Sequence, residues 1–396
     1  QKLKKKLIIL LHGPLSKREF QTFGIEVLKK NFNLSIVEIS PLVNSEHYKF
    51  KRNFNFKIIR NFQELEKFFQ RNKNSMCWET GFSYNSIRIA LLLRKYNIKV
   101  INADGISSLP TKRFLYKTKH YEIFLRRIKL LFFNPFVFFN RLSFFLEAWL
   151  RILRYKKIDI ALIGGDAYAS YNGYKEAKDK IYCSSLDYGF YLSKKKNNLN
   201  LGTKNYAVFI DTYFPFHPEH SSTTGRFIKP KKHFESLINF FNEFESATKL
   251  EIIVALYPKA DLKKYPKEFK KYKLIPNKIT ELVKNCKVVL HHGSTAQSYA
   301  VLFKKPAIYL TTNLMEKYLY IHDNTTRIEF MGQQEINIDN YDKNLLKNSK
   351  KIFYYNKELY KSYLTNYLKH SSSANIPWYK AFSNYYKTNK NSKWKH

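Results

Sequence analysis

The segment at 287–312, KVVLHHGSTAQSYAVLFKKPAIYLTT, constrains the fold more than any other part of the chain. An apolar run at 288–290 is followed by a Gly-Ser-Thr turn, a helical stretch at 296–303 that stops at Lys-Lys-Pro, and a second apolar run at 307–310. Strand, helix and strand in this order predict a parallel βαβ unit. Ligands of such sheets bind at the carboxyl ends of the strands.

The turn after the first of these strands is a candidate ligand site. It consists of His291, His292, Gly293, Ser294 and Thr295. Backbone N–H groups and two hydroxyls at the positive end of a helix dipole form a site that suits phosphate, and we therefore expect a nucleotide or phosphate ligand here. The plainer alternative is that the serine only caps the helix. The turn alone leaves both interpretations open.

Strand-like and helix-like segments alternate along most of the chain, which predicts the α/β class with parallel sheets. We expect strands at 7–11, 34–39, 75–78, 98–102, 158–163, 206–210 and 250–256, and helices at 20–30, 62–72, 84–96, 233–245 and 279–285. A polar, turn-rich stretch at 193–204 reads as a linker. The pattern predicts two Rossmann-like domains at 1–195 and 205–350, followed at 351–396 by helices that pack back on the domain junction and a basic tail.

The formal net charge of +39 is extreme and by itself suggests a nucleic acid or an anionic membrane as partner. The excess of lysine comes together with 33 Phe and 30 Tyr, a joint bias that we attribute largely to nucleotide composition. No zinc-finger, homeodomain or RNP motif is present, so we expect no nucleic-acid partner. The cysteines Cys77, Cys183 and Cys286 are too scattered for a disulfide framework or a zinc site, and fit a reducing cytosol.

A basic and aromatic segment at 113–157 interrupts the first domain. It reads as two amphipathic helices with phenylalanine, leucine and tryptophan on one side and lysine and arginine on the other, as in helices that lie on a membrane surface. A helical pair that packs on the domain with its charges in solvent is the alternative. No window has about 18 uninterrupted apolar residues, so we predict a cytoplasmic protein that is peripheral on the inner face of the cell membrane.

Two α/β domains joined by one linker describe the GT-B architecture of glycosyltransferases. The second domain has Tyr257-Pro258-Lys259 after one strand and Ser294-Thr295 after another, and the first domain has Asp104-Gly105 after a strand. This arrangement resembles the bacterial sialyltransferases, polysialyltransferases and 3-deoxy-manno-octulosonic acid (Kdo) transferases, which carry a His-Pro pair, a Ser-Ser or Ser-Thr pair and an Asp-Gly pair. Tyr257 stands where that group has histidine, and His291 or His292 is a candidate substitute.

The resemblance implies an inverting glycosyltransferase with an interdomain cleft. Its donor would be a CMP-activated acidic sugar held by 257–259 and 291–295, and Asp104 would be the base that deprotonates the acceptor hydroxyl. Asp166, Asp187 and Asp211 are rivals for that role, and Asp-Gly is also a common turn pair. Lys259 and the N–H groups of 293–295 would stabilise the leaving phosphate.

Further residues in loops at expected strand ends are candidates for acceptor binding, because binding residues concentrate on loops of a rigid scaffold. These are His12, Glu79, Tyr84, Asp211 and His217, with Glu219 in the same loop as the last of them. Histidines at such positions also serve simply as turn residues.

The predicted function is transfer of a sugar to a surface glycan such as lipopolysaccharide, lipooligosaccharide or capsule, with a nucleotide-sugar donor and no other cofactor. A UDP- or GDP-sugar donor is the first alternative, and a non-catalytic or nucleic-acid-binding protein the second. No Asp-x-Asp pair stands at an expected strand end, so we predict no metal. Asp339 and Asp342 are close in sequence but fit a solvated loop better than a magnesium site.

Overall fold

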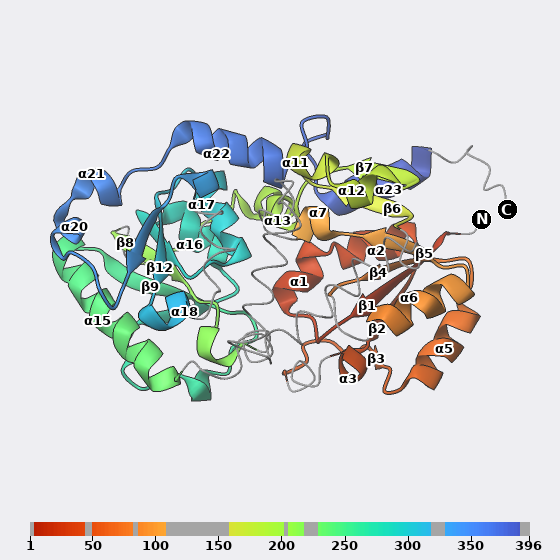
Figure 1. Cartoon of the computed structure of the whole chain (residues 1–396), viewed down its shortest axis with the longest axis horizontal. Coiled ribbons are helices and arrows are strands. Elements are labelled where there is room, and N and C mark those ends of the chain that lie inside the picture. Colours follow the sequence, from red (N-terminus) through yellow and green to blue (C-terminus); the bar gives the residue numbers. More distant parts are fainter. Residues whose placement is uncertain are drawn as a thin grey trace. The chain divides into compact units, whose positions relative to one another are not determined.

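The structure is a computed structural model that describes residues 4–43, 50–81, 86–107, 158–201, 205–217, 229–317 and 329–388. Its chain divides into two compact units. Unit 1 comprises the described parts of 1–108 and 121–189 together with the C-terminal part from 367, and unit 2 comprises the described part of 190–366. Each unit contains one sheet, and all strand pairs of both sheets are parallel (Figure 1). The predicted α/β class is confirmed.

The sheet of unit 1 has the order β3-β2-β1-β4-β5-β6-β7. Chain order reverses between β1 and β4, which makes that pair the point of the sheet at which ligands are expected. The strands are β1 Lys6–Leu11, β2 Asn33–Glu38, β3 Lys57–Ile58, β4 Met76–Glu79, β5 Lys99–Asn102, β6 Ile160–Ile163 and β7 Asp179–Tyr182.

Helices cover both faces of this sheet, so alternate residues of β1 enter two different cores. One core contains Leu7 and Ile9 together with residues of α2 and α23. The other contains Ile8 and Leu10 together with residues of α5 and α6. The described helices are α1 Lys17–Thr22, α2 Ile25–Asn31, α3 Ser40–Val43, α5 Phe62–Arg71, α6 Ser86–Lys95, α7 Asp104–Ser107, α11 Asp166–Ala169, α12 Asn172–Lys175, α13 Leu186–Lys194 and α23 Trp378–Thr388.

The single helix expected at 20–30 is two helices in the structure, because the chain turns at Gly24. A capping box begins α1, in which Ser16 Oγ accepts from the Glu19 amide at 3.1 Å. Gly24 has a φ of +65° and a Cβ there would lie 2.2 Å from the ring of Tyr379. Glycine is therefore required both by the backbone and by the close approach of α23.

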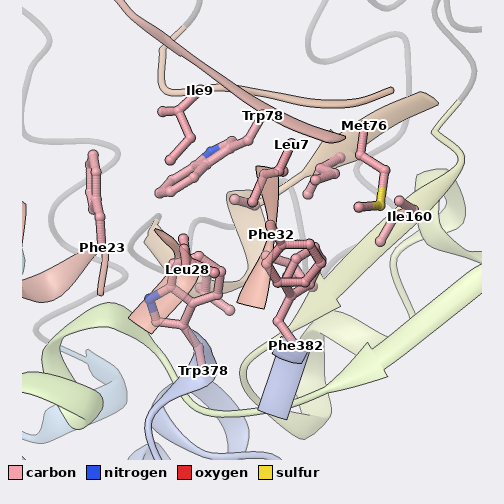
Figure 2. Packing of buried hydrophobic residues seen from close by; sticks show 14 of the residues in the cluster. Leu7, Ile9, Phe23, Leu28, Phe32, Met76, Trp78, Ile160, Trp378 and Phe382 are labelled. Carbon is pink, nitrogen blue, oxygen red and sulfur yellow. The ribbon is translucent and has the colours of Figure 1, made fainter. Parts of the chain in front are cut away.

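The C-terminal helix α23 completes a core of unit 1, as Figure 2 shows. Trp378 is 2% exposed, lies edge-on to Trp78 at 5.3 Å between ring centroids, and donates from its indole N–H to the carbonyl of Thr22 at 3.0 Å. The hydroxyls of Tyr385 and Tyr386 both reach Asp179 on β7. Of the helix expected at 352–378, residues 357–368 are helical, whereas 370–377 have no regular structure and α23 begins at 378.

Unit 2 has the strand order β10-β9-β8-β11-β12-β13, with the reversal of chain order between β8 and β11. Strands 206–210 and 288–291 pair in parallel, with Ile210 opposite His291. The strands are β8 Tyr206–Ile210, β9 Glu251–Leu256, β10 Lys273–Pro276, β11 Val288–His291, β12 Ala307–Thr311 and β13 Gln334–Asn337.

Helices α16 Ile279–Asn285 and α17 Ser298–Leu302 pack on one face of this sheet, where Leu282 and Tyr299 meet Val208. Helix α15 Pro230–Thr248 packs on the other face, where Phe241 contacts Phe209. The remaining helical segments are η1 Phe214–Phe216, η2 Leu262–Lys264, η3 Phe269–Lys271, η4 Thr295–Gln297, α18 Asn313–Lys317, α20 Asn344–Lys347, α21 Ser349–Ile352, α22 Lys357–Tyr363 and the π-helical η5 Leu364–Leu368. Among the described residues, no helix is both long and apolar enough to span a bilayer.

Candidate functional site

The strand ends β8, β9 and β11 of unit 2 bring several predicted residues to one edge of the sheet. Asp211 follows β8, Tyr257 follows β9 and His292 follows β11. Because β8 lies between β9 and β11, these three residues stand side by side at the carboxyl edge, at the reversal of strand order. The predicted donor-binding residues are thus collected at one place within unit 2.

Gly293 gives the turn after β11 its shape. It has a φ of +87°, a backbone conformation that glycine adopts without steric cost. Its amide donates to Nδ1 of His291 at 3.0 Å, and Nε2 of His291 bonds to Oε1 of Gln333 at 3.0 Å. Both ring nitrogens of this fully buried histidine are therefore engaged inside unit 2. His291 supports the turn from within, and we assign it a positioning role.

Ser294 caps the short helix that follows, since its Oγ accepts from the amide of Ala296 at 3.2 Å. The hydroxyl of Ser294 therefore acts as a helix cap, the simpler of the two roles considered for it. The neighbouring Thr295 is exposed. Among the residues that the structure describes, the amides of Ser294 and Thr295 have no hydrogen-bond partner. These two N–H groups are available to an anionic ligand.

His292 is buried and neutral. Its Nδ1 lies 2.7 Å from the carbonyl oxygen of Leu310, so that nitrogen carries the proton and donates. Burial lowers the pKa of His292 to about 4. Its ring lies against Phe209, Phe214 and His233. Nε2 is buried without a hydrogen-bond partner in the described part of the chain, which leaves an acceptor site that a ligand hydroxyl or N–H group could fill.

Two further buried polar atoms of the same edge have no partner among the described residues. They are Oγ1 of Thr212, which follows Asp211, and Nε2 of Gln297, which lies in η4 after the turn. Buried side-chain polar atoms of this kind are normally hydrogen-bonded. Together with Nε2 of His292 they indicate that this edge of unit 2 is built to contact a polar ligand. Neither residue was a sequence candidate, because neither belongs to a recognisable motif.

The carboxylate of Asp211 accepts several hydrogen bonds. It accepts from the amides of Tyr213 at 2.9 Å and Tyr257 at 3.2 Å, and from the hydroxyl of Tyr265 at 2.5 Å. Burial raises the pKa of Asp211, and these three donors act in the opposite direction. We expected this residue to bind the acceptor. Its contacts instead join the ends of β8 and β9 and hold the segment at 257–259 in place.

The segment Tyr257-Pro258-Lys259 forms a partly exposed aromatic and basic surface. Tyr257 stacks parallel to Tyr213 at 5.8 Å, and His217 meets the ring of Tyr257 edge-on at 5.2 Å. Burial, and next the positive charge of Lys259, lower the pKa of His217 to about 4. A cation beside stacked rings suits a nucleotide, whose base stacks and whose phosphate is an anion.

In unit 1, the sequence candidates His12 and Glu79 form a pair at the ends of β1 and β4. Nε2 of His12 lies 2.9 Å from Oε1 of Glu79, and both side chains are about nine-tenths buried. A carboxylate only accepts, so Nε2 carries a proton, and in the neutral form of the ring Nδ1 is the nitrogen that has the lone pair. A Cβ at Gly81 would lie 2.8 Å from Nδ1 of His12, so glycine leaves the room that the ring occupies. This is the geometry of a histidine base oriented by a carboxylate.

Asp104 lies at the end of β5, the neighbour of β4. Its Oδ2 accepts from the side-chain amide of Asn102 at 3.0 Å, and its own amide donates to Oδ1 of Asn102. The hydroxyl of Tyr174 bonds to that same Oδ1 and to the amide of Gly105. A Cβ at Gly105 would come within 2.5 Å of the carbonyl of Leu162, which explains the Asp-Gly pair by close packing of β6.

The other carboxylates considered as bases have structural partners. Asp187 forms an ion pair with Arg18 at 2.6 Å. Asp166 accepts from the amide of Ser371 at 2.7 Å. Asp339 and Asp342 accept from backbone amides, and the described residues contain no cluster of three or more potential metal ligands. The candidates Tyr84 and Glu219 and the segment 113–157 lie outside the described residues.

Comparison with known proteins identifies the fold. A scan against protein-family models and a search of curated proteins gave no match to this chain. Three solved structures are similar over nearly its whole length. The glycotransferase of kitacinnamycin has a TM-score of 0.52 at 8% identity, covering 98% of this chain and 99% of that one. The putative UDP-N-acetylglucosamine 2-epimerase from Listeria monocytogenes has a TM-score of 0.52 at 11% identity, covering 98% and 97%.

The wall teichoic acid polymerase TagF has a TM-score of 0.52 at 12% identity, covering 100% of this chain and 91% of that one. At such identities the similarity concerns the fold alone. The two parallel sheets, each with a reversal of strand order, are those of the GT-B fold. The chain therefore has the GT-B fold of two Rossmann-like domains that known glycosyltransferases and nucleotide-sugar epimerases share.

Proposed function

We propose that this protein is a glycosyltransferase that uses a nucleotide-activated sugar. The observation that carries the proposal is the carboxyl edge of the unit 2 sheet. There, at the reversal of strand order, the amides of Ser294 and Thr295 and one side-chain polar atom each of Thr212, His292 and Gln297 have no hydrogen-bond partner among the described residues. In a fold that glycosyltransferases also have, such an edge supports binding of the nucleotide part of a donor.

The donor is proposed to be a CMP-linked acidic sugar, such as a sialic-acid-like nonulosonate or Kdo. The support for this choice is the Ser294-Thr295 pair and the Asp104-Gly105 pair, by which the chain resembles the CMP-sugar-dependent enzymes. Tyr257 in place of histidine is a departure from that pattern. A UDP-linked donor is the alternative, favoured by a structural neighbour whose name specifies a UDP-sugar. In either case Lys259 would neutralise phosphate charge in the transition state.

The acceptor is proposed to bind unit 1, where His12 is a better general base than Asp104. In the neutral ring, Nδ1 of His12 offers a lone pair that no residue of the described ranges occupies, and Glu79 orients the ring, whereas an oxygen of Asp104 already accepts from Asn102. The acceptor hydroxyl would give its proton to His12 as its oxygen attacks the anomeric carbon. The bond from that carbon to the phosphate oxygen breaks, and the electron pair leaves with the nucleotide.

The acceptor class and location follow the sequence-based proposal, in which the sugar is added to a surface glycan at the inner face of the cell membrane. The basic and aromatic composition of the segment at 113–157 supports a site of action near anionic lipid. The GT-B fold of TagF, a wall teichoic acid polymerase, is compatible with work on cell-surface polymers.

A second candidate function is epimerisation of a nucleotide sugar. The putative UDP-N-acetylglucosamine 2-epimerase from Listeria monocytogenes resembles this chain as closely as the glycosyltransferases do. An epimerase needs no acceptor. Incubation with UDP-N-acetylglucosamine alone, followed by proton NMR of the sugar, distinguishes the two, because only an epimerase would produce the C2 epimer without an acceptor glycan.

The test of the main proposal is release of nucleotide from CMP-, UDP- and GDP-sugars in the presence of lipopolysaccharide as acceptor. We expect one donor class to be consumed with transfer of its sugar. His12→Asn should lower kcat by about 100-fold or more, the range found for loss of a general base, and Glu79→Gln should lower it less. Loss of activity in Asp104→Asn with His12→Asn still active would make Asp104 the base. Failure of every donor to react would contradict the proposed function.

A further inference from the structure

One edge of unit 2, residues 343–361, combines exposed lysines with exposed aromatic rings; we call it the α20–α22 edge. Glu358 is the only acidic residue within these bounds. Lys343 pairs with Glu243 at 2.7 Å, while the other lysines form no ion pair with any residue in the described part of the chain. All six lysines of this edge, the paired one included, are exposed, and they are Lys343, Lys347, Lys350, Lys351, Lys357 and Lys361.

Two large apolar side chains are exposed between α21 and α22. Tyr354 has an exposed fraction of 61%, the highest of the large hydrophobic residues in the described ranges, and its neighbour Phe353 has 41%. Lysine enrichment pervades this chain and needs no special explanation at any one place. Two consecutive exposed aromatic rings do need an explanation, because apolar side chains gathered at a protein surface mark contact with a partner or a membrane.

The packing of helices α21 and α22 leaves the lysines and the two aromatic rings exposed to solvent. Helix α22 buries Tyr360 and Tyr363 against unit 2, and the hydroxyl of Tyr360 donates to the carbonyl of Lys305 at 2.9 Å. Lys357 and Lys361, one helical turn apart, are on the exposed side. Helix α21 likewise buries Ile352 and exposes its lysines. In Figure 1 both helices, shown in blue, run along the outside of the unit 2 sheet.

We propose that the α20–α22 edge docks unit 2 on an anionic lipid surface, with Phe353 and Tyr354 entering the headgroup region and the lysines facing the phosphates. Basic residues beside exposed rings are the composition that binds such interfaces. A soluble polyanion would account for the lysines but would leave the phenylalanine in water. The surface thus fits a bilayer better than a free glycan or nucleic acid.

The test uses the full-length protein and sedimentation with vesicles of phosphatidylcholine, with and without phosphatidylglycerol. We expect binding to the anionic vesicles at low salt and little binding to the neutral ones. Replacement of Lys350, Lys351, Lys357 and Lys361 by Gln should lower the apparent affinity for anionic vesicles by about ten-fold or more, since each lysine near a lipid surface contributes severalfold. Unchanged affinity in this variant would overturn the proposal.

A matched control removes the same number of lysines elsewhere on unit 2. Lys263, Lys267, Lys270 and Lys271 are exposed and have no ion pair within the described residues, and they have no exposed aromatic ring beside them. Their replacement by Gln should lower vesicle affinity severalfold less than the change at the α20–α22 edge. Equal losses in the two variants would mean a non-specific effect of net charge and would also overturn the proposal.

The aromatic residues separate a lipid from a soluble polyanion. Phe353→Ser with Tyr354→Ser removes exposed groups, so the fold should survive, and circular dichroism checks this. We expect weaker binding to anionic vesicles and unchanged binding to heparin. Unchanged vesicle binding, or equal loss of vesicle and heparin binding, would contradict docking on lipid. All of these measurements are made without a sugar nucleotide, so they are independent of the proposed enzymatic function.

Discussion

Histidines near the strand ends differ in what their surroundings leave them able to do. His291 has both ring nitrogens engaged, so it can only support the turn after β11. His292 donates from Nδ1, and its Nε2, which lies among aromatic rings, has no partner in the described part of the chain. His12 has its Nε2–H directed at Glu79, and no described residue bonds to its Nδ1, which suits proton transfer. The chemistry of each residue follows from its partners, and the adjacent pair at 291–292 shows that neighbours in sequence can differ completely.

The sequence singled out His12 and Glu79 separately as turn residues, but it could not show that they pair. Their contact exists because β1 and β4 are adjacent and parallel, with Leu10 opposite Glu79. Pairing of strands so far apart in the chain has no local signature. Thr212 and Gln297 escaped notice for a related reason, since only the burial of their polar atoms makes them unusual. The Gly-Ser-Thr turn was found because its spacing is local.

His292 predicts a pH dependence of stability. Its folded pKa of about 4 is below the ordinary value of 6.5, so the unfolded chain takes up a proton between these pH values that the folded chain does not. Stability should therefore fall as pH decreases from 6.5 to 4, by on the order of 3 kcal/mol for this group. Urea unfolding at pH 7 and pH 4.5 measures the change.

The control is His292→Gln, which retains an N–H donor for the carbonyl of Leu310 but does not titrate. We expect the unfolding free energy of this variant to decline less between pH 7 and pH 4.5 than that of the unchanged protein. An identical decline in both proteins would show that the buried neutral histidine is not a source of acid sensitivity.

At the level of elements, the central strands of both sheets could be predicted from the sequence, whereas the strands at the edges could not. The central strands β1, β8, β9, β11 and β12 are almost wholly buried, and their continuous apolar runs reveal them. The strands missed from sequence are β3 and β7 at the edges of one sheet, and β10 and β13 at the edges of the other. Each is short and partly exposed, so it lacks the apolar run that marks a strand.

The break between α1 and α2 gives a prediction about packing of elements. Gly24→Ala should destabilise unit 1 by a few kcal/mol, because a left-handed backbone costs about 1–2 kcal/mol for alanine and the new Cβ would clash with the ring of Tyr379. Chemical unfolding followed by tryptophan fluorescence reports this loss. Adding Tyr379→Ala to the Gly24→Ala variant tests the clash separately.

The clash is relieved in the double variant, which should lose less stability than the sum of the two single variants. Additive losses would mean that the close approach of α23 to this turn does not determine the requirement for glycine.

At the scale of the whole molecule, the chain leaves unit 1 after 189 and supplies its last core residues from 367 onward. Trp378, Phe382 and Tyr386 are buried in a core whose other members precede 190, so unit 1 is complete only when the C-terminal helix is present (Figure 2). Burial of such aromatic side chains contributes several kcal/mol, a large part of the stability of a typical domain.

Truncation after Asn366 should therefore unfold unit 1 and leave unit 2 folded. Hydrogen exchange read by mass spectrometry is expected to show loss of protection in β1 and β4, with protection retained in β8 and β9. Truncation after Thr388 is the control, since it removes none of these buried rings and should change neither unit. Full protection of β1 in the shorter protein would contradict the role assigned to α23.

The central claim is that the carboxyl edge of the unit 2 sheet binds the nucleotide of a sugar donor, and calorimetric titration with CMP, UDP and GDP tests it most directly. We predict that CMP binds more tightly than UDP and GDP, and that Lys259→Met weakens this binding by about ten-fold through loss of a phosphate contact. The exposed Lys263→Met serves as the matched control and should bind as the unchanged protein does. Absence of binding by all three nucleotides, or equal affinity in both variants, would contradict the claim.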